Sequence, residues 1–378
     1  MTPPRLHWFV LAGGLSPYTL ALWERLVARS GHTVTLAYTP REPQPDFAHE
    51  TDVIASVNVE LVPIQSLRAV VKLGARCARN PHAAIVCMGH SPIYNIAISA
   101  VARALGPGRR LLLYMSDANG IALADSTGST PIAKSKRLLK RVVLGNAFGS
   151  SLDLGYSNAL AHRMLGIRKG INIPLLPIEF PQPLEPMLPE PLAALVRDLP
   201  RPRLLTVARL IGLKNLVAQG SAFLDAIAEG MPGSLTVVGE GPQRARLESV
   251  FSRMPGRAVL AGAVPFTSSR RIFGAFDGMM LASTLEPWGI AIIEGLGWGL
   301  PVLASRHCGA GLSMARETGD AVKLCGTSKE ELKAGLLDFV GDLDRHTAAA
   351  KLAAPMIRRK FELTAVADAL IELGKDSQ

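Results

Sequence analysis

Cysteine is scarce in this sequence, and the cysteines that it has are not paired. The 378 residues contain 4 cysteines, none in a C-x-x-C pair or at a spacing typical of metal ligands. This pattern argues against a disulfide framework and against a cysteine-based metal site, and it is typical of reduced thiols in the cytosol. The four residues are Cys77, Cys87, Cys308 and Cys325.

Long hydrophobic runs are also missing. The longest stretch without a charged residue, residues 80–102, contains two prolines, two histidines, Ser91 and Asn95, which argues against a membrane-spanning helix. The apolar run at residues 6–12 is too short for the core of a signal peptide. We therefore expect a cytoplasmic protein that is soluble or peripheral on the inner face of the cytoplasmic membrane.

Acidic residues are few in the first half of the chain. Residues 1–180 contain 19 Lys and Arg against 10 Asp and Glu, whereas residues 181–378 contain 22 against 21. Nearly all of the formal net charge of +10 therefore belongs to the first half. A negatively charged partner, such as anionic lipid, a phosphorylated acceptor or nucleic acid, is expected to bind to that half. Aromatic side chains do not interleave with its basic cluster, so nucleic acid is the least favoured of these partners.

Two domains are expected from the length and from a break in composition. The chain is 48% hydrophobic, enough for sizeable cores, and nine prolines within residues 174–202 are typical of a linker. Strand and helix patterns alternate on both sides, which indicates an α/β protein with parallel sheets. We assign residues 1–178 to an N-terminal domain, 179–202 to the linker, 203–355 to a C-terminal domain and 356–378 to a C-terminal helix, within a helical pattern at 346–374.

A glycine pair follows the first predicted strand, at residues 6–12. Gly13 and Gly14 precede a predicted helix for which Ser16 is a suitable N-cap and Pro17 a suitable first residue. Glycine N–H groups at the start of a helix can bind phosphate. The pair lacks the G-x-G-x-x-G spacing of a dinucleotide site. A tight strand-to-helix turn without a ligand is the alternative.

Polar residues follow two further predicted strands of the first half. His90 comes after the strand at residues 83–88, and Asp117 after the strand at 111–115. Ligands gather at the carboxyl ends of strands in open α/β sheets, so both residues are candidates for a site. A structural histidine and an Asx-turn are the alternatives. A short strand is expected at residues 151–156, followed by a helix at 159–165.

A basic amphipathic helix is predicted at residues 131–144. Its apolar residues, Leu138, Leu139, Val142 and Val143, are expected to face inward. The cations would then lie on an ordinary solvated surface or against anionic lipid or an acceptor. These cations are Lys134, Lys136, Arg137, Lys140 and Arg141.

The second half repeats the α/β pattern, with strands at residues 204–208, 234–238, 278–282 and 302–304. Arg209 and Lys214 follow the first of these strands, in a loop before a predicted helix at 216–228. A guanidinium fork and a lysine point charge at the end of a strand can converge on a diphosphate. Two solvated surface cations are the alternative.

Two glutamates flank a predicted helix start after the strand at 278–282. Pro287 suits the first turn of a helix, and Gly289 and Ile290 lie where its unpaired N–H groups would bind an anion. Glu286 precedes this turn, and Glu294 lies inside the helix among apolar residues, where a carboxylate needs a partner. A capping glutamate and a solvated one are the alternative.

These motifs together resemble a known family. The Arg209-x4-Lys214 loop, the Gly239-Glu-Gly-Pro242 turn and the Glu286-to-Glu294 spacing resemble retaining glycosyltransferases of family 4, also called glycosyl transferase group 1. The resemblance implies a GT-B fold, in which two Rossmann-like domains face a central cleft and a C-terminal helix crosses back to the N-terminal domain.

The resemblance also implies roles for individual residues. Arg209 and Lys214 match the residues that hold the donor diphosphate, Glu294 the ribose ligand, and Glu286 the contact to the donor sugar. Backbone groups at Gly239, Gly289 and Ile290 would complete the donor site, and Gly13 and Gly14 would close over the phosphates. Glu286, His90 and Asp117 are the candidate catalytic residues.

The implied activity is transfer of a sugar, with retention, from a UDP- or GDP-sugar to a glycan, lipid-linked or polysaccharide hydroxyl. Two cations and a helix N-terminus can stabilise the leaving diphosphate, so we expect no metal and no cofactor. A GT-B relative with other chemistry, such as a sugar-nucleotide epimerase, is one alternative. A non-catalytic sugar- or polyanion-binding protein is another. The four residues Arg209, Lys214, Glu286 and Glu294 argue against the second.

Overall fold

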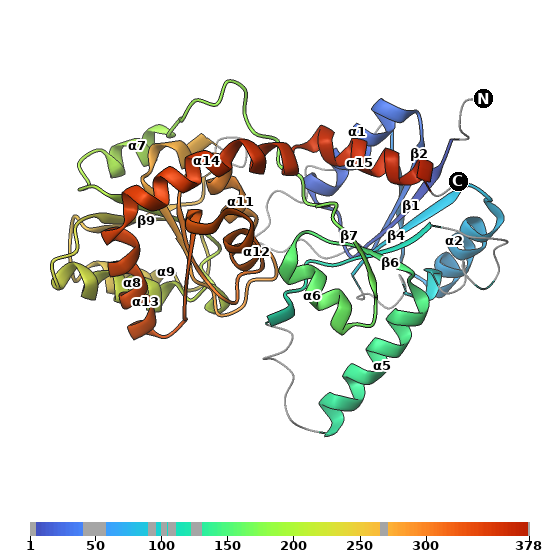
Figure 1. Cartoon of the computed structure of the whole chain (residues 1–378), viewed down its shortest axis with the longest axis horizontal. Coiled ribbons are helices and arrows are strands. Elements are labelled where there is room, and N and C mark those ends of the chain that lie inside the picture. The colour runs from blue at the N-terminus through green and yellow to red at the C-terminus, as the bar shows by residue number, and fades with distance from the viewer. Residues whose placement is uncertain are drawn as a thin grey trace. The chain divides into compact units, whose positions relative to one another are not determined.

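A computed structural model of the chain describes residues 5–40, 58–89, 96–99, 104, 111–121, 131–264 and 271–376. The chain divides into two compact units. Unit 1 consists of residues 1–178 together with residues 360–378, and unit 2 consists of residues 179–359. Each unit is built around its own parallel sheet (Figure 1).

Unit 1 contains a seven-stranded sheet in the order β3-β2-β1-β4-β5-β6-β7, and its strand pairs are parallel. The central strands are buried because both faces of a parallel sheet are covered. Phe9, Leu11, Ile85 and Tyr114 belong to the core on one face. The strands are β1 (His7–Ala12), β2 (Thr33–Tyr38), β3 (Glu60–Pro63), β4 (Ala83–Met88), β5 (Leu111–Met115), β6 (Ser150–Leu152) and β7 (Lys169–Ile171).

The first helix of unit 1 begins as predicted from its capping residues. The Ser16 side chain accepts a hydrogen bond from the Thr19 N–H, Pro17 occupies the first turn, and the helix ends at a left-handed Gly31. Ser66 caps the second helix in the same way. The described helices that precede β7 in the sequence include α1 (Pro17–Ser30), α2 (Leu67–Arg79), α5 (Pro131–Ala147) and α6 (Tyr156–Met164).

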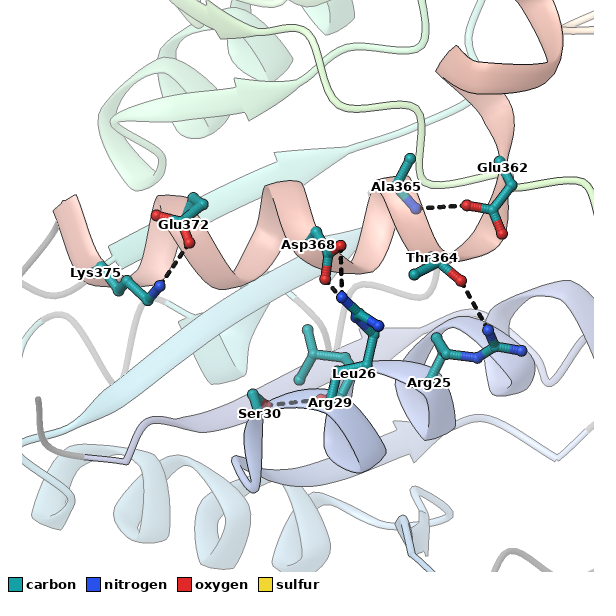
Figure 2. Close-up of polar contacts among 10 residues, drawn as sticks. All are labelled: Arg25, Leu26, Arg29, Ser30, Glu362, Thr364, Ala365, Asp368, Glu372 and Lys375. Atoms are coloured by element: carbon teal, nitrogen blue, oxygen red, sulfur yellow. Dashed lines mark hydrogen bonds and ion pairs between the residues drawn. The ribbon is translucent and has the colours of Figure 1, made fainter. Parts of the chain in front are cut away.

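The C-terminal helix α15 (Leu363–Asp376) belongs to unit 1 and packs along α1. Figure 2 shows Arg29 of α1 bonded by both Nε and Nη2 to the carboxylate of Asp368, at 2.5 and 2.9 Å. Arg25 donates to the Thr364 hydroxyl at 2.7 Å. Leu370 is fully buried, so an apolar contact accompanies these surface bonds. The first and last helices of the chain thus complete one unit.

Unit 2 contains a six-stranded parallel sheet in the order β10-β9-β8-β11-β12-β13. Helix α8 packs against α13 beside this sheet, and Phe223, Leu235 and Phe339 belong to the core that they form. Ser328 and Glu331 form a capping box at the start of α13. The strands are β8 (Arg203–Val207), β9 (Ser234–Val238), β10 (Ala258–Gly262), β11 (Gly278–Leu281), β12 (Val302–Ser305) and β13 (Val322–Cys325).

Residues 179–202, for which a linker is predicted, fall within unit 2 and include a helix, α7. Leu192 and Val196 of this helix are buried. The boundary between the units at residues 359 and 360 lies inside α14. The described α-helices of this part include α7 (Glu190–Val196), α8 (Leu216–Ala228), α9 (Arg244–Phe251), α11 (Ile290–Gly297), α12 (Gly309–Thr318), α13 (Lys329–Gly341) and α14 (Leu343–Phe361).

Two element predictions were wrong. The strand expected at residues 151–156 ends at Leu152, and Tyr156 already begins α6. The single helix expected at residues 346–374 is two helices separated at Glu362, which pairs with Ile178. In both places the apolar pattern continues across a change of backbone direction, and periodicity alone does not show where an element ends.

The packing of α15 gives a stability prediction. Leu370→Ala should lower the free energy of opening of unit 1 by about 2–4 kcal/mol, because it leaves a cavity in a fully buried contact. Asp368→Ala should cost less than about 1 kcal/mol, because both partners of its ion pair are nearly half exposed. Hydrogen exchange of the β1 amides, followed by mass spectrometry, measures both changes. Equal effects of the two variants would contradict this account.

Candidate donor site in unit 2

The carboxyl edge of the unit 2 sheet has a topological switch point between β8 and β11. The chain runs outward from β8 to β9 and β10 on one side, and from β11 to β12 and β13 on the other. Loops that leave two adjacent strands in opposite directions open a crevice between them, and ligands of open α/β proteins bind there. The predicted residues Arg209 and Lys214 follow β8, and Glu286 follows β11.

The loop after β8 is held by polar side chains that the sequence argument did not identify. Asn215 has a left-handed backbone with φ of 58°, and its Nδ2 donates to the carbonyls of Ala282 and Thr327 at 3.3 and 3.0 Å. Gln219 donates to the Lys214 carbonyl at 2.6 Å and accepts from the Ala282 N–H at 3.1 Å. These bonds fix the loop that carries Lys214 to the end of β11. An asparagine directly before a predicted helix was the available signal.

Lys214 and Glu286 meet in an ion pair between Nζ and Oε2. Lys214 lies at the end of a short 3-10 helix, η1 (Gly212–Lys214), and Glu286 lies in the loop after β11. The side chains are 16% and 9% exposed. Two of the four predicted charged residues are therefore in direct contact at the switch point, while Arg209 is exposed in the same loop as Lys214.

The backbone of Glu286 is fixed by the loop after β12. Its N–H donates to the His307 carbonyl, and its own carbonyl accepts from the Gly309 N–H, both at 3.1 Å. Cys308 lies between them, and its thiol donates to the Leu281 carbonyl at 3.1 Å. Burial raises the pKa of the Cys308 thiol to about 11, so it remains a protonated donor at neutral pH. Three loops of the same sheet edge are thus tied together.

The helix after Glu286, α11, starts at Ile290, where the sequence predicted unpaired N–H groups. Pro287 lies before this helix rather than in its first turn, where it had been predicted. Gly289 is the N-cap residue with φ of 98°, a left-handed conformation that favours glycine. The first N–H groups of α11 therefore follow a glycine, at the place where the sequence predicted an anion site. Glu294 is on this helix and is 8% exposed.

The role of Gly239 in donor binding stays a prediction, and the structure gives this residue a packing role. A Cβ atom at Gly239 would lie 1.9 Å from the Ala208 carbonyl oxygen, so only glycine fits at this position. The Leu210 N–H then donates to the Glu240 carbonyl at 2.8 Å. The turn after β9 therefore supports the segment that carries Arg209.

The sheet of unit 1 has its own switch point, between β1 and β4. Gly13 and Gly14 follow the last residue of β1, and Gly89 follows the last residue of β4. The glycine pair therefore lies at the edge of unit 1 where the fold would place a ligand. His90 lies outside the described residues.

Asp117 is exposed and follows a buried polar network at the end of β5. The Ser116 hydroxyl bonds to His162 Nε2 at 3.0 Å, and His162 Nδ1 bonds to Asp153 at 2.6 Å. The Asn119 side chain accepts from the Ile121 N–H at 3.0 Å, which is the Asx-turn weighed as an alternative for this segment. The structure thus shows how the segment of Asp117 is held.

The prediction that Leu138, Leu139, Val142 and Val143 face inward was wrong. These side chains are exposed, and so are Lys140 and Arg141. The buried residues at this end of α5 are Leu144 and Ala147, followed by Phe148. An amphipathic pattern identifies an apolar face, but it does not show whether another element covers that face. The helix also contains Lys134, Lys136 and Arg137.

The described residues hold no group of three or more His, Cys, Asp or Glu side chains placed to bind a metal ion. Within the same ranges, no helix combines the length and the apolar character needed to cross a membrane. All four cysteines are buried, and none of them forms a disulfide bond.

Two parallel-sheet units, each with a switch point at its carboxyl edge, define a GT-B fold. Known structures agree with this description. The structure of Anabaena Alr3699/HepE in complex with UDP and glucose superimposes with a TM-score of 0.68 over 98% of this chain and 100% of that chain. The two sequences are 15% identical, so this likeness establishes the fold alone.

The sequence of unit 2 is similar to one family of glycosyltransferases. Residues 201–364 match the family described as Glycosyl transferases group 1. The predicted GT-B fold and the resemblance to group 1 are thereby confirmed, while membership of family 4 stays a prediction.

Two curated proteins resemble shorter parts of the chain. A lipopolysaccharide core biosynthesis glycosyltransferase, LpsD of Rhizobium meliloti, is 26% identical over 153 residues, which are 40% of this chain and 44% of that protein. The sulfoquinovosyl transferase SQD2 of Arabidopsis thaliana is 28% identical over 109 residues, which are 29% and 20% of the two chains. The matched part thus spans less than half the length of either relative.

The ion pair at the switch point gives a prediction that does not depend on function. Lys214→Ala should lower the free energy of unfolding of unit 2 by about 3 kcal/mol, because it leaves the Glu286 carboxylate buried without this cation. The double variant Lys214→Ala/Glu286→Gln should recover much of that loss, because the charge is removed. Urea denaturation of the single and double variants tests the coupling. Strictly additive effects would contradict the pairing.

Proposed function

We propose that this chain is a retaining glycosyltransferase that moves a sugar from a nucleoside diphosphate sugar to an acceptor hydroxyl. The observation that carries the proposal is the edge of unit 2 at which Lys214, Glu286 and the start of α11 converge. A cation, a carboxylate and a helix N-terminus suit a ligand that combines a diphosphate with hydroxyl groups. Residues 201–364, which contain this edge, match the group 1 family.

The donor would be held by both charged and backbone groups. Arg209 and Lys214 bind the diphosphate, and the N–H groups at Gly289 and Ile290 bind the phosphate or the sugar. Glu294, which is 8% exposed, accepts bonds from the ribose hydroxyls. Glu286 accepts from a hydroxyl of the transferred sugar, and Gly239 shapes the loop beneath Arg209.

The ion pair of Lys214 with Glu286 changes its role when donor binds. Without donor, each charge satisfies the other in a site with little exposure to water. With donor, the ammonium turns to a phosphate oxygen and the carboxylate to a sugar hydroxyl. Binding therefore replaces one set of charge-assisted bonds by another and leaves no buried charge unpaired. The ion pair also keeps both side chains in this position before the donor binds.

The reaction needs stabilisation of a leaving group. The bond from the anomeric carbon to the diphosphate oxygen breaks, and the acceptor oxygen bonds to the same carbon on the same face. The acceptor proton passes to the departing diphosphate. The two cations and the N-terminus of α11 stabilise the charge that develops on this diphosphate. We propose that this stabilisation needs no metal ion and that the enzyme uses no cofactor.

Unit 1 would supply the acceptor side. Gly13 and Gly14 lie at the carboxyl edge of its sheet and would close over the donor phosphates. His90 and Asp117 remain candidates for contacts to the acceptor or the transferred sugar. Asp117 is exposed in a segment held by Asn119 and by the network around Ser116, which suits a residue that meets a substrate.

The proposed substrates are chosen from the chemistry of the site and from the ligands and names of similar proteins. We propose a UDP- or GDP-sugar as donor, in line with the UDP and glucose bound by the Anabaena protein. A glycan, polysaccharide or lipid-linked hydroxyl is the proposed acceptor, in line with the lipopolysaccharide core glycosyltransferase of Rhizobium meliloti. Because the excess of cations lies in the first half of the sequence, we also propose a cytoplasmic protein whose basic half is attracted to an anionic membrane surface.

Nucleotide binding provides the test. UDP, GDP and their sugars should be compared by thermal shift and titration calorimetry, and one base should raise the melting temperature in a saturable manner. Glu294→Ala should weaken binding of that nucleotide roughly tenfold to a hundredfold, because a bond to a charged acceptor is lost. Donor hydrolysis and transfer to a glycan acceptor then measure activity.

The matched control is Glu330→Ala, which removes an exposed glutamate from α13 and should leave binding unchanged. Glu294 suits this test better than Lys214, because loss of Lys214 also removes the ion pair. If neither UDP nor GDP nor any of their sugars binds the wild-type protein, the donor site does not exist as proposed. Wild-type affinity in Glu294→Ala would remove the ribose assignment only.

A further inference from the structure

Helix α5 carries an apolar face that no described element covers. Leu138 and Leu139 are 62% and 64% exposed, and Val142 is 51% exposed. With Val143, at 39%, they occupy positions i, i+1, i+4 and i+5, an arc of roughly 140° on one side of a helix. Large apolar side chains gathered in this way mark a surface that binds something. We call these four residues the α5 apolar face.

The position of α5 makes this face accessible. Its C-terminal end is anchored by Leu144, Ala147 and Phe148, which are buried in the core of unit 1. Figure 1 shows the C-terminal end of α5 beside the sheet of this unit, while the N-terminal end extends away from it. The four residues of the apolar face precede this anchored end along the helix and are exposed, so a partner can reach them.

Positive charge flanks the apolar face. The 17 residues of α5 include five Lys or Arg and no Asp or Glu. A hollow at the base of the helix is lined by Leu138, Val142, Arg141 and Arg168. Both arginines are exposed, and among the described residues neither forms an ion pair with a carboxylate. A guanidinium pair beside apolar side chains suits a phosphate that is joined to a hydrocarbon chain.

We propose that the α5 apolar face inserts into an anionic phospholipid bilayer and that the hollow at Arg141 and Arg168 receives a lipid phosphate. Helices that lie in the plane of a membrane have this composition, with a cationic face toward the headgroups and an apolar face toward the acyl chains. The hydrophobic contact gives attachment that survives screening, and the cations give the preference for negative lipid.

A second copy of the chain is a poorer occupant of this surface. In a two-fold dimer the same patch would meet itself, so the cations of one α5 would face the cations of the other. No carboxylate of this helix is available to compensate them. A negatively charged bilayer would cover the apolar side chains and would also neutralise their basic neighbours.

This inference does not rest on the proposed glycosyltransferase activity, and it goes beyond attraction of a basic domain to a negative surface. Attraction alone would be lost in high salt, because the Debye length falls to about 3 Å at 1 M. Insertion of apolar side chains would persist under the same conditions. A binding assay at low and at high salt therefore distinguishes electrostatic attraction from insertion.

The test is co-sedimentation of the full chain with vesicles of phosphatidylcholine alone or with phosphatidylglycerol, at low salt and at 1 M salt. The apolar variant is Leu138→Ser/Leu139→Ser/Val142→Ser, and the charge variant is Arg141→Gln/Arg168→Gln. The matched control is Leu67→Ser/Val71→Ser, which removes two side chains of 70% and 56% exposure from α2 of the same unit. Circular dichroism and thermal unfolding check that each variant is folded.

Wild type and the α2 control should bind phosphatidylglycerol vesicles and retain part of that binding at 1 M salt. The apolar variant should bind roughly tenfold or more weakly and lose the salt-resistant part, because three inserting side chains are gone. The charge variant should lose its preference for phosphatidylglycerol over phosphatidylcholine.

Three results would overturn the proposal. The first is wild-type protein that does not bind either kind of vesicle. The second is an apolar variant that binds like wild type at both salt concentrations. The third is a wild-type dimer in light scattering that dissociates in the apolar variant, because this face would then be covered by a second copy.

Discussion

The ion pair between Lys214 and Glu286 is the interaction on which the edge of unit 2 depends. It joins the loop after β8 to the loop after β11, and both loops are fixed further by Asn215, Gln219 and the segment after β12. A buried pair of this kind contributes little net stability, because desolvation offsets the attraction. Its value lies in geometry, because it holds two opposite charges within reach of one ligand. Neither charge could be placed in so enclosed a position without the other.

The same arrangement of strands gives both units a binding edge. In unit 1 the strands diverge at β1 and β4, and in unit 2 they diverge at β8 and β11. The two edges carry different chemistry. Unit 2 offers opposite charges and the start of a helix, while unit 1 offers a glycine pair and the segment of Asp117. A donor with a diphosphate and an acceptor with a hydroxyl place these two different demands on a protein. The two halves of the sequence also differ in net charge, since the excess of cations lies in unit 1, which contains α5.

Much of the fold could be predicted from the sequence, since the buried strand β4 is an unbroken apolar run and β2 and β9 are rich in β-branched residues. The wrong predictions have a common cause. Pro287 is compatible with a first turn, but the turn at Gly289 moves the helix start to Ile290. The apolar residues of α5 have the spacing of a buried face, yet the helix extends beyond the core. Sequence patterns report local preference, whereas burial is decided by residues distant in the chain. For the same reason the contacts of Asn215 and Gln219 could not be inferred.

The return of the chain to unit 1 has a consequence for synthesis on the ribosome. Helix α15, the last helix, packs on α1, the first, and Ile178 bonds to Phe361 at 2.7 Å where the chain leaves and re-enters this unit. Everything that unit 2 needs emerges before the final helix does. Unit 2 can therefore fold during translation before α15 emerges, while α1 keeps an apolar surface uncovered until α15 has left the ribosome. A stop codon ahead of α15 would thus damage the unit to which α1 belongs.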